Sequence, residues 1–448
     1  MRSQIFILWV IWGLIAVIAV QLIGHSPEEF QAYLWCSTGL ILGCIYLALV
    51  KAKVPSNGSN KLFVFGSLIL VIFVHLFFWF GIPILEDDYF RYSFDGRNSR
   101  LGEHPYANPP EYYFSQNSPE YAKKINHPDL RTIYAPVAQV LFLSESLYPN
   151  TIYGWWLLII FSDICLVIFT WLYFKKYNLP WHNFLIIWLN PIWLKEGLNS
   201  GHLDIMVAVF LWLAVYFSIK DSVKFKYLAT FFISLAVGIR PYLGIILAYF
   251  MKKNYLKFFI LGVFFLIVPW VILFTLPNAP EIKEALQSWQ IFIKRWEFNS
   301  LFFDFFYRLN KVFLTEWKWS RYLGWAFGFV ALLFLFWKSR HQKDYIFWGS
   351  MAVVAWFLFQ PTVNAWYFLP CIGVCGAHLV FLNLHENLYK GVLSSLAISL
   401  PMSYMHYLDI DRKFLDFRWA LGEILLMVLA LLFFILPINR QKMNSQSL

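Results

Sequence analysis

Residues 62–88 read LFVFGSLILVIFVHLFFWFGIPILEDD, an apolar run that ends in three consecutive carboxylates. The apolar part is long enough to cross a bilayer, which requires about 20 apolar residues in a helix. Glu86, Asp87 and Asp88 therefore stand where a membrane helix is expected to meet water, and this is an unusual place for three acids. The stretch predicts a membrane protein with an acidic motif at one membrane surface.

The rest of the chain repeats this apolar character. Of its 448 residues, 60% are hydrophobic, 21% are aromatic and only 14% are charged, whereas about a quarter of the residues in a soluble domain are charged. Further apolar runs of spanning length predict helices and not a barrel, at 4–23, 31–50, 152–174, 257–276, 321–337, 345–359, 366–382 and 419–436. We expect an all-α, polytopic membrane protein with about 13 or 14 spanning or half-spanning helices, in one domain over residues 1–448.

Basic residues indicate the topology. The formal charge is +10, but the Lys and Arg residues occur in short clusters between apolar runs, so they indicate membrane orientation and not a nucleic-acid partner. The lysines within 51–61 place that loop in the cytoplasm. The long polar segment 86–150, which contains the acidic motif, is then a large extracytoplasmic loop.

A second long run, 227–251, decides the orientation of everything that follows it. Lysines on both sides of it are assigned to the cytoplasm, so the run has to leave and return, with an apex at Arg240-Pro241. Pro241 discourages helix at Arg240, and an Arg inside a straight span would face hydrocarbon. The alternative is one straight helix over 227–251, which would invert the downstream topology.

The acidic motif suits general-base chemistry. If the helix continues past the membrane boundary, Asp87, Arg91 and Asp95 share one face, and Asp88 and Tyr92 form a neighbouring pair. Arg91 would then neutralise Asp87 and leave Asp88 free to accept a proton, so we favour Asp88 as the base. The alternative is a solvated helix start with charge pairs.

Under the predicted topology the concentrated polar motifs face the same side of the membrane. They are 86–110, NHPDLRTIYAPVAQ (126–139), GHLD (201–204), RPY (240–242), WEFNS (296–300) and QPTVNAWY (360–367). Each also has an ordinary explanation, as a helix cap, an interfacial Arg or an aromatic-belt anchor. Together they suit sugar transfer from a lipid phosphate: an Asp takes the proton of an acceptor hydroxyl, Arg240 and His202 hold phosphate oxygens, and aromatic rings stack on the sugar.

Several of these stretches resemble landmarks of one enzyme family. DDYFRYSFDGR (87–97), GEHPYANPP (102–110), NHPDLRTIYAPVAQVLF (126–142) and LNPIWLKEGLNSGHLDIMVAVFLWLAVY (189–216) resemble bacterial integral-membrane glycosyltransferases of the GT-C superfamily. The similarity is strongest to polyprenol-phosphate-mannose-dependent mannosyltransferases. Two departures are Arg240, where many relatives have Lys, and two extra helices before the acidic loop.

The resemblance implies a GT-C-like helical fold, a lipid-phosphate sugar donor, inversion at the anomeric carbon and an Asp base at Asp87 or Asp88. We therefore expect a hexosyltransferase, with mannose as the sugar, that acts on an acceptor hydroxyl of a glycan, glycolipid or polymer. Its expected surroundings are the plasma membrane bilayer, the polyprenyl-phosphate-sugar donor and the acceptor, with the active site on the extracytoplasmic face. No metal, cofactor or nucleic acid is expected.

Two other function classes remain open from the sequence. A transporter or flippase of a lipid-linked sugar would also use membrane carboxylates and broken helices, although the carboxylates here cluster at one surface and inverted repeats are missing. The other is an assembly partner in an envelope complex. Besides Asp87 and Asp88, the candidate substrate-binding residues are Arg91, Tyr92, Asp95, Arg97, His127, Tyr134, His202, Asp204, Arg240, Tyr242, Asn299, Trp366 and Tyr367.

Overall fold

The fold is helical throughout the part of the chain that the structure describes. The computed structural model describes residues 2–52, 54, 61–116, 118–248, 256–313, 318–339, 344–382, 385–408 and 417–435. Within these residues there is no strand, and one isolated bridge joins Phe298 to Thr362. The prediction of an all-α protein is therefore confirmed.

Six of the described helices are long and apolar enough to cross a membrane: α1 (Arg2–Gly24), α2 (Glu28–Lys51), α3 (Lys61–Trp79), α6 (Tyr153–Tyr177), α11 (Leu256–Thr275) and α15 (Lys318–Lys338). A seventh span is possible if η4 (Trp193–Asn199) and α8 (Asp204–Ser218), which are bent by 115°, count together. These helices indicate a multi-pass membrane protein. They do not confirm the larger predicted number of crossings.

The remaining elements are shorter helices and single turns. They are α4 (Asp88–Arg100), η1 (Pro110–Tyr113), η2 (Glu120–Lys124), α5 (Pro136–Phe142), η3 (Leu143–Leu147), α7 (Trp181–Trp188), α9 (Val223–Ile239), η5 (Pro241–Gly244), α10 (Ile245–Ala248), α12 (Ile282–Ala285), α13 (Gln287–Arg295), α14 (Leu301–Phe313), α16 (Tyr345–Phe357), η7 (Ala365–Phe368), α17 (Leu369–Phe381), α18 (Glu386–Ser399), η8 (Leu400–Leu408) and α19 (Phe417–Ile435).

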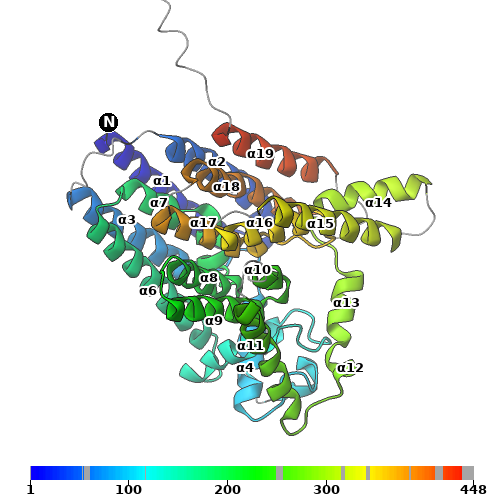
Figure 1. Ribbon diagram of the computed structural model, residues 1–448. Helices are drawn as coiled ribbons and strands as arrows, with labels where there is room; N and C mark the ends of the chain where they lie inside the picture. Colours follow the sequence, from blue (N-terminus) through cyan, green and yellow to red (C-terminus); the bar gives the residue numbers. More distant parts are fainter. Residues whose placement is uncertain are drawn as a thin grey trace, which may run out of the picture.

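The helices pack as a bundle in which α8 lies between α9 and α17, and α18 lies between α2 and α19. Figure 1 shows this bundle, with α4 and its neighbouring loops at the end opposite the N-terminus. Small residues allow the closest approaches, as is usual between membrane helices. A Cβ at Gly43 of α2 would lie 2.5 Å from the carbonyl oxygen of Ala397 in α18, so this crossing requires glycine.

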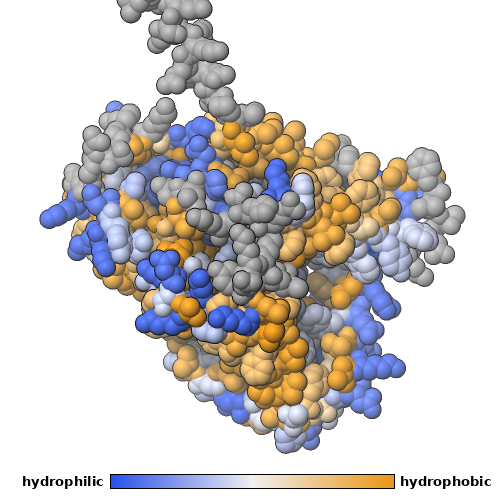
Figure 2. Space-filling model, viewed as in Figure 1, coloured by the Kyte–Doolittle hydropathy of each residue, from blue (hydrophilic) through white to orange (hydrophobic). Residues whose placement is uncertain are grey.

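Large hydrophobic areas, orange in Figure 2, lie on the face of the molecule that this view shows. Helix α11 is the clearest case, because it exposes Leu256, Ile260, Phe264, Ile267 and Val271 along its length. A soluble protein rarely exposes a continuous apolar face of this size. The surface is therefore consistent with contact to lipid.

The acidic motif does not continue the preceding helix. Helix α3 ends at Trp79, and a non-helical connection leads to α4, which begins at Asp88. Gly81 and Pro83 lie in this connection, and both disfavour helix. The assumption of one helix running through the membrane boundary to Asp95 is therefore wrong.

Two further helix ends lie beside prolines, and the second is the expected apex at Arg240-Pro241. Helix α7 ends at Trp188, next to Asn190-Pro191, and α9 ends at Ile239, with Arg240 in an extended conformation before η5. The straight helix over 227–251 is thereby excluded up to residue 248. The end of this run and part of the basic segments at 51–61 and 252–257 lie outside the described residues.

Candidate active site

A cavity of about 1030 Å³ lies among the polar motifs. Its walls come from the connection between α1 and α2 and from residues within 82–91, 124–134, 288–298 and 364–367, together with Arg240 and Tyr407. Most of these residues are in loops or at helix ends, not in the middle of a span. The cavity therefore brings together segments that are far apart in the sequence.

The two aspartates stand side by side on the cavity wall. Asn126 donates from Nδ2 to Asp87 Oδ1 at 2.7 Å and to Asp88 Oδ1 at 2.9 Å. An amide nitrogen has two hydrogens, so one Asn serves both carboxylates. Tyr92 donates its hydroxyl to Asp88 Oδ2 at 3.3 Å, as the predicted pairing of these two residues requires.

The turn that presents the aspartates is strained. Leu85 has a φ of 57°, and His127 has a φ of 46°. Left-handed conformations are uncommon for residues other than glycine, although asparagine, aspartate and histidine adopt them more often than the rest, so Leu85 is the clearer outlier; such conformations concentrate at functional sites. Both residues line the cavity.

The predicted neutralisation of Asp87 by Arg91 is wrong. Arg91 donates from Nε to Asp95 Oδ1 at 2.9 Å and from Nη2 to the carbonyl oxygen of Leu130 at 2.9 Å. Asp87 precedes the first residue of α4, so the i, i+4 spacing that brings Arg91 to Asp95 does not extend back to it. Arg91 instead fastens α4 to the loop at 127–130.

The pKa of Asp87 is raised by its surroundings. Burial, together with the negative charges of Asp88 and Glu86, raises the pKa of Asp87 to about 7, against the opposing effects of the Asn126 hydrogen bond and His202. A carboxyl with a pKa in this range is suited to accept a proton near neutral pH. Burial and the neighbouring acids, and not an arginine, therefore set the proton affinity of Asp87.

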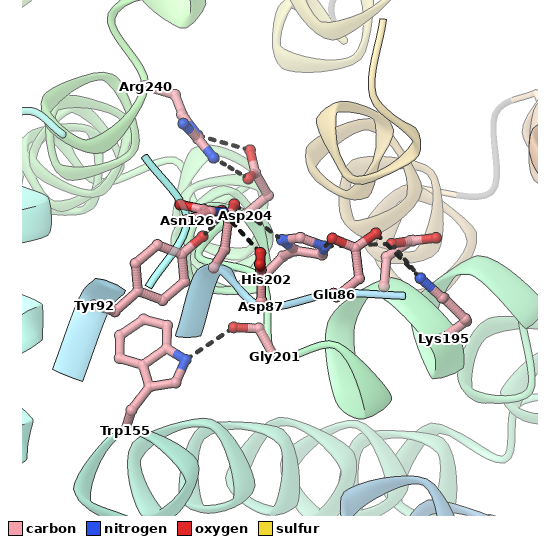
Figure 3. Close-up of polar contacts among 12 residues, drawn as sticks. Glu86, Asp87, Tyr92, Asn126, Trp155, Lys195, Gly201, His202, Asp204 and Arg240 are labelled. Carbon is pink, nitrogen blue, oxygen red and sulfur yellow. Dashed lines mark hydrogen bonds and ion pairs between the residues drawn. The ribbon is translucent and has the colours of Figure 1, made fainter. Parts of the chain in front are cut away.

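A second group of charged residues is buried behind the aspartates (Figure 3). We call Glu86, Lys195, Glu196, His202 and Tyr404 the buried cluster. Lys195 Nζ is 3.4 Å from Glu86 Oε1 and 3.4 Å from Glu196 Oε2, and it also contacts the Tyr404 hydroxyl. That hydroxyl is 2.8 Å from both Glu86 Oε1 and Glu196 Oε1.

The charges in this cluster largely offset each other. Burial would raise the pKa of Glu86, but the positive charges of Lys195 and His202 outweigh burial and hold that pKa below its usual range. The cluster connects three elements, because Glu86 precedes α4, Lys195 and Glu196 lie in η4, and Tyr404 lies in η8. It thereby fixes the backbone next to Asp87.

The donor set of a metal site is present in part. Ligand atoms of Glu86, Glu196 and His202 lie within 4.8 Å of one another. However, the Lys195 ammonium group already contacts both carboxylates, and a divalent cation in the same place would be repelled by it. We therefore treat these residues as an ion cluster and not as metal ligands.

Arg240 is paired with a protein carboxylate. Its Nε is 3.0 Å from Asp204 Oδ1 and its Nη2 bonds to Asp204 Oδ2, while Tyr242 donates to Asp204 Oδ1 at 3.1 Å. The sequence left open whether the anion that meets Arg240 belongs to the protein or to a ligand, and the structure provides a protein carboxylate. Helix α8 begins at Asp204 and packs against α9, which ends just before Arg240, so the pairing follows from helix packing.

Aromatic rings surround the polar groups. Trp366 stacks on His202 with a centroid distance of 3.9 Å and an angle of 18° between the ring planes. The Arg240 guanidinium lies 5.7 Å from the Tyr367 ring and 5.9 Å from the Tyr134 ring. Trp366, Tyr367 and Tyr134 all line the cavity, where flat apolar faces and a cation are available to a ligand.

The predicted site residues fall into three sets. Those that line the cavity are Asp87, Asp88, Arg91, His127, Tyr134, Arg240, Trp366 and Tyr367. Those that contact a lining residue from behind are Tyr92, Asp95, His202, Asp204 and Tyr242. The other two are bonded elsewhere: Arg97 donates to Asn150, and Asn299 donates to the carbonyl oxygen of Val363.

Sequence reasoning missed five residues of this region as site members: Glu86, Asn126, Lys195, Glu196 and Tyr404. Lys195 and Glu196 did have a detectable signal, because charged residues inside an apolar stretch are costly and are usually paired or functional. Asn126 and Tyr404 had none, since neither type is unusual near a membrane surface.

No protein-family model matches the chain, and no curated protein or solved structure matches it either.

Proposed function

We propose that the protein is a membrane glycosyltransferase that moves a hexose, mannose in the first instance, from a polyprenyl-phosphate donor to an acceptor hydroxyl. The observation that supports this best is the pair Asp87 and Asp88, which share Asn126 on the wall of a cavity that also contains Arg240. Such a site offers a base, a cation for an anionic leaving group and aromatic faces for a sugar.

In the proposed reaction Asp87 accepts the proton of the acceptor hydroxyl as the oxygen attacks the anomeric carbon. The bond between that carbon and the phosphate oxygen breaks, and its electron pair leaves with the polyprenyl phosphate. Attack opposite the leaving group inverts the anomeric centre. We assign the base to Asp87 in place of Asp88 because, among the described residues, no cation forms an ion pair with Asp87, and because its pKa is raised to about 7.

Arg240 is the proposed phosphate ligand. Asp204 holds the Nε and Nη2 edge of its guanidinium, which leaves Nη1 as the nitrogen directed away from that carboxylate. A guanidinium fixed in this way loses little freedom when it binds a second anion. Arg240 is 13% exposed in its side chain and lines the cavity, so a donor phosphate has access to it.

The sugar and the membrane complete the proposal. Trp366 and Tyr367 provide ring faces beside the aspartates, and sugars stack on such faces. We place the site on the extracytoplasmic face of the plasma membrane, in a GT-C-like arrangement with about 13 or 14 crossings or half-crossings. The acceptor belongs to a glycan, glycolipid or polymer.

The test is a transfer assay with the purified protein in detergent or lipid nanodiscs. Polyprenyl-phosphate-mannose with a labelled sugar is incubated with a set of simple and sugar alcohols, and glycoside and released polyprenyl phosphate are measured. We expect both products from the wild type and neither from an Asp87→Asn/Asp88→Asn double variant. Absence of transfer and of donor hydrolysis under all conditions would refute the proposal.

A transporter of lipid-linked sugars is the competing function. A coupling site is expected near the middle of the membrane, where broken helices meet, whereas the walls of this cavity come mostly from loops and helix ends. Reconstitution into liposomes with a fluorescent polyprenyl-phosphate sugar distinguishes the two. Movement of the lipid between leaflets without any sugar transfer would favour the transporter.

A further inference from the structure

His202 has a carboxylate at each end of its ring. Its Nε2 is 3.3 Å from Glu86 Oε2 and 3.5 Å from Glu196 Oε2, and its Nδ1 is 3.8 Å from Asp88 Oδ2. The side chain is fully buried. Figure 3 shows the ring beside Glu86.

The ring has little freedom to turn away from these neighbours. Trp366 stacks on one face at 3.9 Å, and the His202 amide donates to the carbonyl oxygen of Glu196 at 3.2 Å. The preceding Gly201 has a φ of 63°, and a Cβ there would lie 2.9 Å from the Trp156 ring. Trp155 also donates from Nε1 to the Gly201 carbonyl oxygen at 2.8 Å. The GHLD turn therefore sets the ring position.

This position favours the doubly protonated ring. A neutral imidazole has a lone pair on one nitrogen, and here that lone pair would point toward a carboxylate oxygen whichever tautomer formed. An imidazolium ion instead presents a positive charge to Glu86 and Glu196 on one side and to Asp88 on the other. Lys195 is the second cation of the buried cluster. It contacts both glutamates and the Tyr404 hydroxyl.

We propose that His202 is a positioning residue which, as an imidazolium ion, holds the Asp88 carboxylate in place by charge attraction beside the proton-accepting Asp87. This proposal rests on the proposed transferase function and adds a division of roles between the two aspartates. The Asp88 carboxylate faces the cavity, where its charge stabilises the positive charge that develops on the sugar ring during transfer. Its charge also favours proton uptake by Asp87.

The surroundings of His202 explain why its charge matters more for Asp88 than that of Lys195. Among the described residues, His202 faces Glu86 and Asp88 of the acidic turn, Glu196 of η4 and Trp366 of η7. Tyr404 of η8 lies on the far side of the two glutamates. Lys195 and Tyr404 already engage the glutamates. His202 is therefore the cation of the cluster that reaches toward Asp88.

The pH dependence of transfer tests this role. In His202→Gln, removal of the cation makes ionisation of Asp87 less favourable, so the acid limb of kcat/KM should move up by about one pH unit or more. Transfer should recover at high pH to within about tenfold of the wild type. His182→Gln is the matched control, because His182 is also buried but is bonded to Trp9 in another part of the bundle.

A residue with only a structural role would lower kcat/KM by a similar factor at every pH. That result, or an acid limb at the same pH as in the wild type, would overturn the proposal. A shift of the same size in His182→Gln would also overturn it, because the effect would then not depend on the position of the cation.

A second measurement does not depend on catalysis. Thermal unfolding of the wild type, His202→Gln, Asp88→Asn and the double variant forms a double-mutant cycle. If an imidazolium ion attracts Asp88, the double variant should unfold at a higher temperature than the sum of the two single effects predicts. Additive shifts would refute the interaction. If the wild type transfers no sugar, the proposed function fails, while this cycle still decides whether His202 and Asp88 are coupled.

Discussion

The Arg240 guanidinium lies side-on against the Asp204 carboxylate, with Nε 3.0 Å from Oδ1. The two residues are 36 positions apart, at the end of α9 and the start of α8. Asp204 is fully buried, whereas Arg240 reaches the cavity. The pair therefore joins the scaffold to the proposed phosphate site, and this makes a simple alanine substitution ambiguous.

We expect Arg240→Ala to lose most transfer, but part of the loss will come from instability. Removing one member of a buried ion pair typically costs about 3–5 kcal/mol, because the other charge is left without a partner. An Arg240→Gln/Asp204→Asn variant removes both charges and retains hydrogen-bonding groups. It should fold, as judged by its unfolding temperature, yet show weakened donor affinity in a titration with polyprenyl-phosphate-mannose.

Arg240→Lys is the complementary variant, since it retains the charge and loses the two-pronged geometry. We expect weakened but measurable transfer. If the folded Gln/Asn double variant has the same donor affinity and turnover as the wild type, the donor phosphate binds elsewhere in the cavity.

The two aspartates should respond differently to amidation. Asp87→Asn removes the proposed base, and we expect turnover to fall by about 10²–10⁴-fold, the usual contribution of general-base catalysis. Asp88→Asn retains that base and should lose less. Turnover of both purified variants at saturating donor provides the comparison, with Asp221→Asn, an exposed residue, as the control. Near wild-type turnover in both would show that these carboxylates only organise the start of α4.

Transfer by the wild type should fall at acidic pH. The pKa of Asp87 is about 7 because burial and the adjacent acids oppose its ionisation. Only the ionised form accepts a proton, so kcat/KM should decrease as the pH is lowered through about 7 and should be higher above it. A profile that stays flat between about pH 6 and 8 would assign the base to another group.

The raised pKa of Asp87 also affects the stability of the fold. Ionisation of Asp87 at higher pH promotes transfer but lowers stability. The folded-state pKa of Asp87 lies above the value of about 3.9 for an unfolded chain, so the folded state holds a proton that the unfolded state has lost, and stability falls as the pH rises between these values. Asp87→Asn should therefore stabilise the protein at about pH 8, by on the order of 1 to 4 kcal/mol. Thermal unfolding at low and high pH measures this, and a destabilised Asp87→Asn at high pH would contradict it.

The buried cluster should be cooperative. Lys195→Met leaves Glu86 and Glu196 without their shared ammonium group, and we expect destabilisation of about 3–5 kcal/mol. A Lys195→Met/Glu196→Gln variant removes one charge of each sign and should recover part of that loss. The exposed Lys224→Met is a control that should change stability by less than about 0.5 kcal/mol. A double variant no more stable than Lys195→Met would show that the charges are not coupled.

Cysteine labelling tests the predicted topology. Ser115 and Asn278 are exposed in the polar loops, and Ser222 is exposed in a basic one. A membrane-impermeant thiol reagent added to whole cells should label Ser115→Cys and Asn278→Cys, and it should label Ser222→Cys only after permeabilisation. Direct labelling of Ser222→Cys from outside would overturn the assignment of sides, and with it the extracytoplasmic location of the site. Asn299 is fully buried and does not report on topology.

Much of the fold follows from local properties that the sequence displays. Apolar runs of spanning length predicted the long helices, because a membrane helix must satisfy its own backbone hydrogen bonds. Pro191 and Pro241 marked breaks, since proline lacks the amide hydrogen and restricts the residue before it. The break near Pro83 was not expected, because that proline lies inside the apolar run that predicted a helix. The pairing of Asp88 with Tyr92 also follows from helix geometry alone.

The partners of the charged residues were decided only by the tertiary structure. Whether Arg91 meets Asp87 or Asp95 depended on where α4 begins, and the loop after α3 settled it. Glu86 meets Tyr404, 318 positions away, and Arg240 meets Asp204 because α8 packs on α9. Spacing along the chain specifies neighbours within about two helical turns. Contacts between distant segments depend on which helix faces come together, and no local pattern in a single sequence encodes them.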